Sequence, residues 1–370
     1  MPPTSRRQSA RRASAPRRAW RLGGAGAAFA GAAAIALVLT GCAGGGAPTS
    51  SDGDEPRIVA TTTQVADFAR ELAGDQAEIT QLIQPGQSAH AFDPSAAQLV
   101  ALSQADAVVA NGAGLESWLD DALDAAGYDG PVIDASEGIE LFGTDDHEAE
   151  STSDDHEAES DEADHDDADH TDHDGHEHGE GNPHTWTDPA LAEHMVERIA
   201  DGLVEVPGID ASAVETAEAA YLEQLDALDA WIRENVDQVP VEDRLLVTNH
   251  DAFTYFLHAY DITLVGSVIP SFDDNAEPSA ADIDELVASI RETGVQAVFA
   301  EDAISPKTAA TIAREAGVEV YSGEDALYGD SLGAPGSDGE TYLGSQVHNV
   351  ELIVASWGVE ASEPPAGLRG

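Results

Sequence analysis

The chain has 370 residues, and its 71 Asp and Glu outnumber its 16 Lys and Arg to give a formal net charge of −55. A protein this acidic lacks the basic surface through which proteins bind nucleic acid or anionic membranes. The 42% hydrophobic content excludes a wholly disordered chain, and the length exceeds that of one usual core, so we expect two lobes. The single cysteine excludes an intramolecular disulfide.

Residues 1–41 are predicted to be an export signal. Seven arginines and no acidic residue fall within residues 1–21, and residues 22–40 are small or apolar, which is typical of secretory signals. An uncleaved membrane anchor is the alternative, although the apolar run is barely long enough to span a bilayer. Paired arginines leave both twin-arginine and general export open.

The sequence Leu39-Thr40-Gly41-Cys42 resembles a bacterial lipoprotein box. In that class of protein Cys42 would receive a diacylglycerol and become the new N-terminus, and two acyl chains would hold the protein durably on the membrane. Residues 42–56 are rich in Gly, Ser and Asp, and we expect them to form a flexible tether.

Strand-like and helix-like segments alternate along the mature chain in two series. The first series predicts strands at 57–62, 77–83, 107–110 and 131–135, with helices at 65–72, 94–103 and 115–126. The second predicts strands at 245–248, 263–269, 297–300 and 318–321, with helices at 251–259, 279–292, 306–316 and 342–357. Such alternation predicts an α/β fold of two lobes, each with a mostly parallel sheet flanked by helices.

A long helical pattern lies between the two series. Apolar residues recur at intervals of three or four from Val214 to Val236, with charged residues between them. An ordinary surface helix of either lobe is the alternative. The length of such a helix, about 36 Å, and its position in the chain favour a rigid spine that joins the lobes and limits their opening.

These patterns divide the chain into six parts. They are the signal 1–41, the tether 42–56, the first lobe 57–190, connecting helices 191–240 that include the spine, the second lobe 241–359, and the tail 360–370.

Residues 144–181 form an insertion of distinct composition, with 18 acids, seven histidines and no basic residue. It has no hydrophobic periodicity, so we predict disorder when no metal is bound. A solvated acidic linker is the alternative, but the density of imidazoles favours metal capture. The seven are His147, His156, His165, His170, His173, His176 and His178.

Six histidines lie outside the insertion, and three of them fall in loops between predicted elements. His90 follows a strand, His184 precedes a helix that begins at Asp188-Pro189, and His250 ends a strand. Ligands of open α/β sheets bind beyond the carboxyl ends of the strands. Asp330, after the last strand of the second lobe, is a further candidate. On sequence spacing alone these residues do not form a metal motif.

The other three histidines, His194, His258 and His348, fall inside predicted helices, where a packing or surface role is expected.

From about Arg57 to Trp357 the chain resembles the metal-specific solute-binding lipoproteins of ABC importers, the cluster 9 or zinc/manganese-binding family. The matching segments occur in the family's order: Pro85 to Pro94, Asn182 to Pro189, His250 to Phe256, Val298 to Glu301, and Gly339 to Asn349. The resemblance implies two α/β lobes joined by a rigid helix, with metal between them. It also implies that the metal ligands are His90, His184, His250 and Asp330.

The resemblance also indicates which metal ion we expect the protein to bind. Manganese-type members carry a carboxylate at the position of His250, whereas three imidazoles and one carboxylate suit borderline Zn²⁺ better than hard Mn²⁺. Zinc-type members often carry a histidine-rich acidic insertion before the second ligand, as residues 144–181 do. The Gly329-Asp330-Ser331 sequence resembles manganese-type members instead, and water is the alternative to Asp330 as fourth ligand.

The sequence therefore predicts an extracytoplasmic zinc-binding protein, anchored through Cys42, that acts as a monomer and delivers Zn²⁺ to the permease and ATPase of an ABC importer. The alternatives are a manganese importer component and a surface zinc buffer or adhesin. A zinc hydrolase with Glu301 as base is disfavoured, because the chain has no His-Glu-x-x-His motif and Asp330 would fill the open coordination position.

Overall fold

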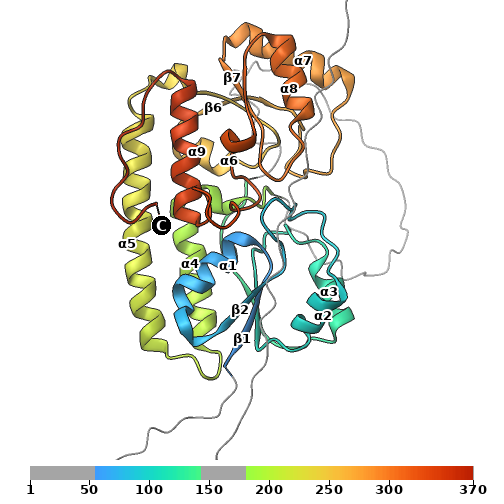
Figure 1. Ribbon diagram of the computed structural model, residues 1–370, viewed down its shortest axis with the longest axis vertical. Helices are drawn as coiled ribbons and strands as arrows, with labels where there is room; N and C mark the ends of the chain where they lie inside the picture. The colour runs from blue at the N-terminus through green and yellow to red at the C-terminus, as the bar shows by residue number, and fades with distance from the viewer. Residues whose placement is uncertain (1–54, 143–180, 370) are drawn as a thin grey trace, which may run out of the picture. The chain divides into compact units, whose positions relative to one another are not determined.

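The computed structural model describes residues 55–142 and 181–369. Cys42, the predicted export signal and the seven histidines of the insertion lie outside the described residues. The described residues belong to one compact unit, in which two α/β halves lie along a pair of long helices (Figure 1). None of the described helices combines the length and the apolarity that a membrane span requires.

The first half is built on a four-stranded parallel sheet with strand order β2-β1-β3-β4. Its β3 reads Ala-Val-Val-Ala and every residue is buried, as expected for a strand covered on both faces. Ile58 of β1 packs on the side of α1, whereas Val59 packs on the side of α2 and α3. The elements are β1 (Arg57–Ala60), α1 (Thr63–Ala73), η1 (Gly74–Gln76), β2 (Glu78–Gln81), α2 (Ala96–Leu102), β3 (Ala107–Ala110), α3 (Leu119–Ala126) and β4 (Val132–Asp134).

The second half holds two parallel strand pairs, β5 with β6 and β7 with β8, rather than one continuous ladder. β5 lies beside β7, and an isolated bridge joins Glu301 to Leu327 beyond the second pair. The elements are η3 (Val241–Asp243), β5 (Leu245–Thr248), α6 (Thr254–Ala259), β6 (Thr263–Ser267), α7 (Ala280–Thr293), β7 (Ala297–Phe299), α8 (Lys307–Ala316), β8 (Glu319–Tyr321) and η4 (Gly323–Asp325).

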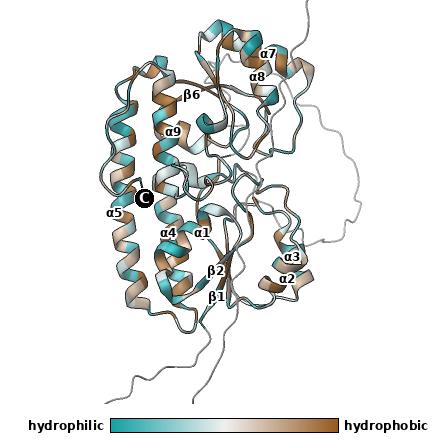
Figure 2. Ribbon diagram, in the orientation of Figure 1, coloured by the Kyte–Doolittle hydropathy of each residue, from teal (hydrophilic) through white to brown (hydrophobic). Residues whose placement is uncertain are grey.

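Two helices, α4 (Pro189–Val204) and α5 (Ala211–Val236), lie between the halves in the chain, and α9 (Tyr342–Ser356) follows the second half and packs on α5 and α1. The predicted spine is confirmed as α5, a helix of 26 residues that packs on α1, α4 and α9. Its predicted apolar stripe is buried except for the partly buried Ala217, and its other face is polar (Figure 2). The predicted start of α4 is also confirmed, because Asp188 caps it and Pro189 occupies the first turn, where a missing N–H costs nothing.

One hydrophobic core extends through both halves of the described chain. Phe68 of α1, Trp186 beside α4, Phe256 of α6 and Val347 of α9 all belong to it. A smaller core is confined to the second half, between its strands and helices α7 and α8. The two halves therefore share buried apolar surface, and a wide separation would expose that surface to water.

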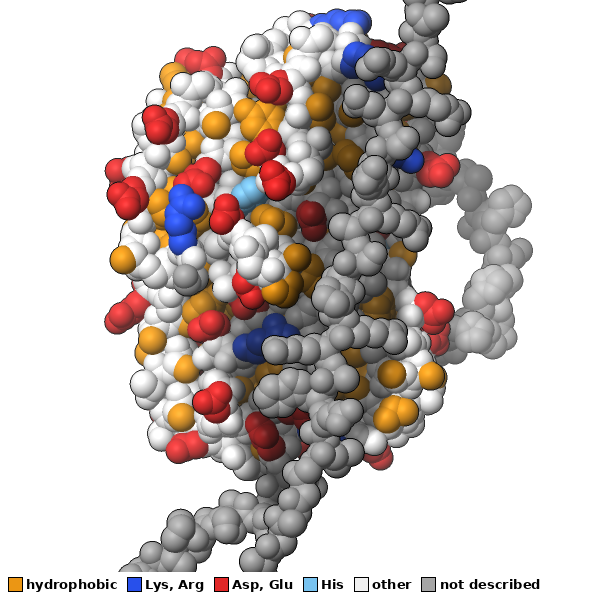
Figure 3. Space-filling view, in the orientation of Figure 1, with side chains coloured by type: hydrophobic (Ala, Val, Ile, Leu, Met, Phe, Trp, Pro, Cys, Tyr) orange, Lys and Arg blue, Asp and Glu red, His pale blue; other side chains and the backbone are white. Residues whose placement is uncertain are grey.

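Acidic side chains are spread over the face seen in Figure 3, with few Lys or Arg among them. This distribution agrees with the composition, which excludes binding to polyanions.

Candidate metal centre

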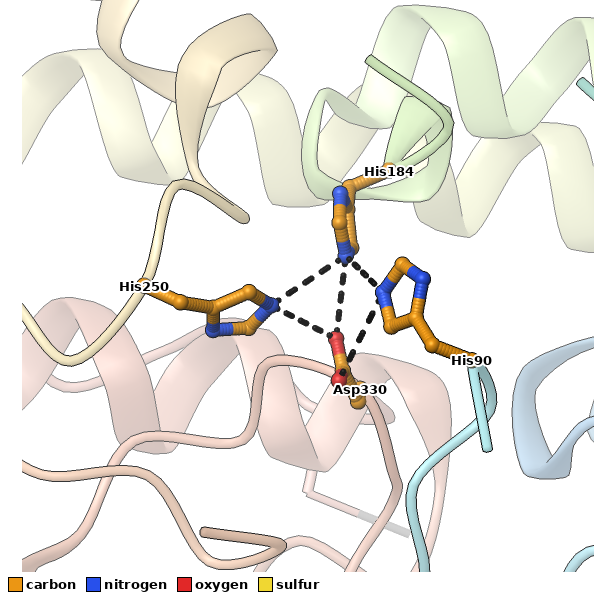
Figure 4. A group of neighbouring side chains, drawn as sticks. All are labelled: His90, His184, His250 and Asp330. Atoms are coloured by element: carbon orange, nitrogen blue, oxygen red, sulfur yellow. Dashed lines mark hydrogen bonds and ion pairs between the residues drawn. The ribbon is translucent and has the colours of Figure 1, made fainter. Parts of the chain in front are cut away.

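Four side chains that are far apart in the sequence converge between the two halves (Figure 4). His90, His184, His250 and Asp330 each offer one ligand atom, and these atoms all lie within 4.8 Å of one another. His90 follows β2 and His250 follows β5, while Asp330 follows β8 and η4. His184 directly precedes the 3₁₀ helix η2 (Thr185–Thr187) and α4. The structure thus brings together all four candidates that the sequence and the resemblance indicated.

The ligand atoms are closely spaced. Nε2 of His184 lies 3.2 Å from Nε2 of His90 and 3.3 Å from Nε2 of His250. Oδ1 of Asp330 lies 3.1 Å from Nε2 of His184 and 3.2 Å from Nε2 of His250. Its other oxygen lies 3.9 Å from Nε2 of His90. The three imidazoles and the carboxylate therefore surround a common point.

The cluster is buried, with one edge near solvent. The side chains of His184, His250 and Asp330 are 0% exposed, whereas that of His90 is 7% exposed. A small ion would therefore approach past His90.

Neighbouring acceptors fix the rings of the two fully buried histidines. Oδ1 of Asn182 lies 3.1 Å from the backbone N and 2.7 Å from Nδ1 of His184. Oε1 of Glu301 lies 3.1 Å from the backbone N and 2.8 Å from Nδ1 of His250. Because these oxygens accept, each Nδ1 carries a proton, and each Nε2 points into the cluster.

The His90 loop is held by contacts on its own half. The Ser88 hydroxyl accepts hydrogen bonds from the backbone N of His90, at 3.2 Å, and of Ala91, at 3.3 Å. The indole of Trp118 donates to the carbonyl of Ala89 at 3.0 Å. The loop therefore presents the imidazole from a fixed backbone.

The segment that carries Asp330 belongs to the second half but is bonded to the first. The carbonyl of Gly329 accepts hydrogen bonds from the side chains of Gln64, at 3.2 Å, and Trp186, at 3.1 Å. Ser331 accepts one from the backbone N of Gly86 at 2.9 Å. These contacts hold the carboxylate against the histidines of the first half.

The electrostatics of the cluster favour a cation. Burial lowers the pKa of His184 to about 4, so this ring is neutral at physiological pH. Burial also opposes charge on His250, but the carboxylates of Glu301 and Asp330 outweigh it and raise its pKa well above the ordinary value. Burial opposes charge on Asp330 too, yet the imidazoles of His250 and His184 hold its pKa well below the ordinary value. Two buried carboxylates thus impose negative potential on the site.

The remaining histidines of the described chain occupy the positions expected of them. His194 lies in α4 and bonds the carbonyl of Glu137, His348 lies in α9 and bonds the carbonyl of Ala326, and His258 of α6 contacts the ring of Phe142. Sequence reasoning did not identify the roles of Asn182 and Gln64. The signals for Asn182 were its place two residues before His184 and its position in the Asn182–Pro189 segment that resembles the family.

Known proteins resemble this chain over most of its length. The family model of the periplasmic zinc-uptake complex component A matches residues 58–356. The manganese-binding lipoprotein MntA of Halalkalibacterium halodurans is 29% identical over 322 residues, which cover 87% of this chain and 95% of that protein. The iron-binding protein YfeA of Yersinia pestis is 28% identical over 302 residues, which cover 82% of this chain and 86% of that protein.

The zinc-binding protein TroA of Treponema pallidum is similar in both sequence and structure. Its sequence is 29% identical over 315 residues, which cover 84% of this chain and 92% of that protein. The solved structure of this periplasmic zinc-binding protein matches with a TM-score of 0.68 and 26% identity, over 82% of this chain and 99% of that one. The likeness therefore extends over both halves and the helices between them.

Proposed function

The chain belongs to the family of the periplasmic zinc-uptake complex component A, and we propose that the ion it carries is Zn²⁺. Members of this family are substrate-binding components of metal ABC importers and not enzymes. The chain is accordingly the extracytoplasmic metal-binding component of such an importer, and its partners are the permease and the ATPase.

The ligand set supports zinc. Three imidazole nitrogens and one carboxylate oxygen lie within 4.8 Å of one another, and borderline Zn²⁺ favours such nitrogen-rich sets. In a tetrahedral zinc site with bonds of about 2.0–2.1 Å, neighbouring ligand atoms are roughly 3.3–3.4 Å apart. Four of the separations in the cluster are 3.1–3.3 Å, close to those edges. In this proposal Asp330, rather than water, is the fourth ligand.

In this proposal the ion is a cargo that bridges the halves. His90 and His184 bind it from the first half, and His250 and Asp330 bind it from the second. Once deprotonated, the rings supply lone pairs, so binding of the ion displaces the proton held by His250, and Asp330 supplies the charge that favours a divalent cation. The shared core keeps the motion that accompanies capture and release small.

Manganese is the second candidate, and the name of one relative favours it. MntA is named for manganese, TroA for zinc and YfeA for iron, so the relatives as a group leave the metal open. Hard Mn²⁺ prefers oxygen ligands, and here it would receive one carboxylate and three nitrogens.

The remaining features belong to the same proposal. Cys42 would anchor the protein on the membrane through a lipid, and the seven histidines of residues 144–181 would collect zinc weakly and raise its local concentration. A surface zinc buffer or adhesin without an importer is distinguished by whether permease and ATPase genes adjoin this one.

The test is calorimetric titration of the metal-free mature chain with Zn²⁺ and Mn²⁺. We expect one tight zinc site, which His250→Ala removes while weak binding by the insertion remains. His194→Ala is the matched control, because this histidine lies outside the cluster, and it should keep the tight site. Survival of tight zinc binding in His250→Ala would refute the assignment, and tighter binding of Mn²⁺ than of Zn²⁺ would select manganese.

A further inference from the structure

Asn182 makes hydrogen bonds to both halves of the molecule through one buried side chain that is 3% exposed. Its Oδ1 accepts from the backbone N and from Nδ1 of His184, at 3.1 and 2.7 Å. Its Nδ2 donates to the carbonyl of Asp251 at 2.7 Å and to the hydroxyl of Thr254 at 3.0 Å. The two ends of one planar amide thus contact a histidine of the first half and the segment that follows His250 in the second.

The orientation of this amide is determined by its partners. The backbone N of His184 can only donate, and the carbonyl of Asp251 can only accept, so the oxygen must face His184 and the nitrogen must face Asp251. The backbone of Asn182 is fixed as well, because its N donates to the carbonyl of Phe142 at 2.8 Å and its carbonyl accepts from the Tyr255 hydroxyl at 2.6 Å. The side chain has no spare hydrogen-bonding group with which to adopt another arrangement.

We propose that Asn182 is a positioning residue that couples the orientation of the His184 imidazole to the closure of the two halves around the ion. This inference rests on the proposed function, since it assigns a role around the same four ligands. While Asp251 and Thr254 are in place, the amide oxygen holds the proton of His184 on Nδ1 and directs Nε2 toward the ion. When the second half moves away, Nδ2 loses both acceptors, and the amide no longer has a single preferred orientation.

Glu301 offers a useful contrast. It supports His250 in the same way as Asn182 supports His184, through one oxygen that accepts from both Nδ1 and the backbone N. A carboxylate has no donor, however, and both hydrogen bonds that Glu301 Oε1 accepts come from His250. Of the two supports, Asn182 is therefore the one whose amide connects a ligand of one half to the backbone of the other.

The test measures the dissociation of Zn²⁺ into excess chelator and the zinc affinity of substituted proteins. Asn182→Ala removes both functions of the amide, and we expect about a 10- to 100-fold loss of affinity, as is usual for partners that orient metal ligands. Asn182→Asp retains the acceptor for His184 but replaces the donor with an oxygen that repels the Asp251 carbonyl. We therefore expect Asn182→Asp to release zinc faster than the unsubstituted protein.

Asn235→Ala and Asn235→Asp are the matched controls. Asn235 is another fully buried asparagine, and its amide bonds the carbonyl of Trp231 and both the hydroxyl and the backbone N of Ser362, away from the cluster. Its substitution should lower stability without changing zinc dissociation. The visible spectrum of bound Co²⁺, which reports ligand geometry, should change with Asn182→Ala and stay the same with Asn235→Ala.

A double-substitution cycle separates coupling from general destabilisation. Thr254→Val removes one acceptor of the amide, and its effect on zinc dissociation should be largely lost when Asn182 is already Ala. If Asn182→Ala does not fold, Asn182→Asp takes its place in the cycle. The effect of Thr254→Val on zinc dissociation should then be largely lost when residue 182 is already Asp.

The inference would be overturned if the substitutions at residues 182 and 254 had additive effects on zinc dissociation. Release of zinc by Asn182→Asp at the rate of the unsubstituted protein would also overturn it. Absence of a tight site in the unsubstituted protein would instead overturn the proposed function itself.

Discussion

Oε1 of Glu301 lies 2.8 Å from Nδ1 of His250 and 3.1 Å from its backbone N, and so it determines both the tautomer and the orientation of a ring that faces the other three ligands. Glu301 is 2% exposed and lies two residues after β7, and His250 lies two residues after β5. Because β5 and β7 are neighbours, their carboxyl ends bring the two side chains together. The glutamate contacts the ring on the side opposite the cluster, which suits a supporting residue rather than a catalytic base.

Glu301→Gln is expected to weaken zinc binding at the tight site by about 10- to 100-fold. The amide oxygen still accepts from Nδ1 of His250, but the negative charge that strengthens this ring as a ligand is lost. Competition with a chromophoric chelator measures the change, and Glu301→Ala should bind more weakly still. Unchanged affinity in both variants would mean that packing alone orients the His250 ring.

Gly329→Ala is expected to weaken zinc binding although residue 329 is not a ligand. A Cβ at this position would lie 3.6 Å from the ring of Phe253 and would overlap the carboxylate of Glu301, whose Cδ would be 3.0 Å away. The carboxylate must then move, and the support of His250 is lost.

Gly202→Ala is the control for this substitution. Its Cβ would come within 2.5 Å of the Ile133 side chain in the first half, so it lowers stability without touching the cluster. Thermal unfolding and zinc titration of both variants should show a loss of stability in each and a loss of zinc affinity only in Gly329→Ala. Equal zinc affinity in the two proteins would contradict this role of Gly329.

The sequence predicted the elements of this fold better than the contacts within its site. A continuous apolar run located β3, and the Asp188-Pro189 pair located the start of α4, because these signals depend on near neighbours. The start of α3 was placed at residue 115 rather than Leu119, because the Gly-rich turn before it, with Ala113 at a positive φ of 53°, was not recognised.

The support of the ligands could not be predicted from local patterns. Glu301 and His250 are 51 residues apart, and Gln64 and Gly329 are 265 residues apart, so each contact depends on which strand ends meet in the folded chain. The four ligands followed from the family resemblance, since their spacing alone did not form a motif. The separation of the second half into two strand pairs also depends on tertiary packing.

Asp67→Asn is expected to stabilise the metal-free protein at neutral pH. Burial raises the pKa of Asp67 to about 6. The hydrogen bond that Asp67 accepts from the backbone N of Tyr342, at 2.8 Å, opposes this rise. Since the pKa is higher in the folded state than in the unfolded state, the contribution of Asp67 to the free energy of unfolding is favourable below about pH 4. This contribution is lost as the pH rises through about 6. The amide oxygen of Asn retains the bond to Tyr342 without the charge.

The stability advantage of Asp67→Asn should therefore grow between pH 4 and 6 and level off at up to about 3 kcal/mol. Urea unfolding across this range in the presence of a chelator measures it. Asp75→Asn, which removes one exposed charge in the same region, is the control and should give a small difference. A constant difference between Asp67→Asn and the unsubstituted protein across the range would show that Asp67 does not titrate as described.

Replacing residues 144–180 by a short Gly-Ser linker is expected to leave the tight site unchanged. The described residues at the two ends of this segment lie together, since the backbone N of Asn182 donates to the carbonyl of Phe142 at 2.8 Å. The ring of Phe142 stacks on Tyr255 with a centroid separation of 4.9 Å, which fixes this junction on α6. A short linker can therefore close the chain without disturbing His184.

Calorimetry should then show one zinc ion bound with the original affinity and the loss of the weak additional binding. A second variant, in which the seven histidines of the segment are replaced by serine, keeps the acidic charge and should give the same tight site. If weak binding persists in that variant, the acids rather than the imidazoles collect the ion. A large loss of affinity at the tight site in both variants would place histidines of this segment among its ligands, because neither variant alters His90, His184, His250 or Asp330.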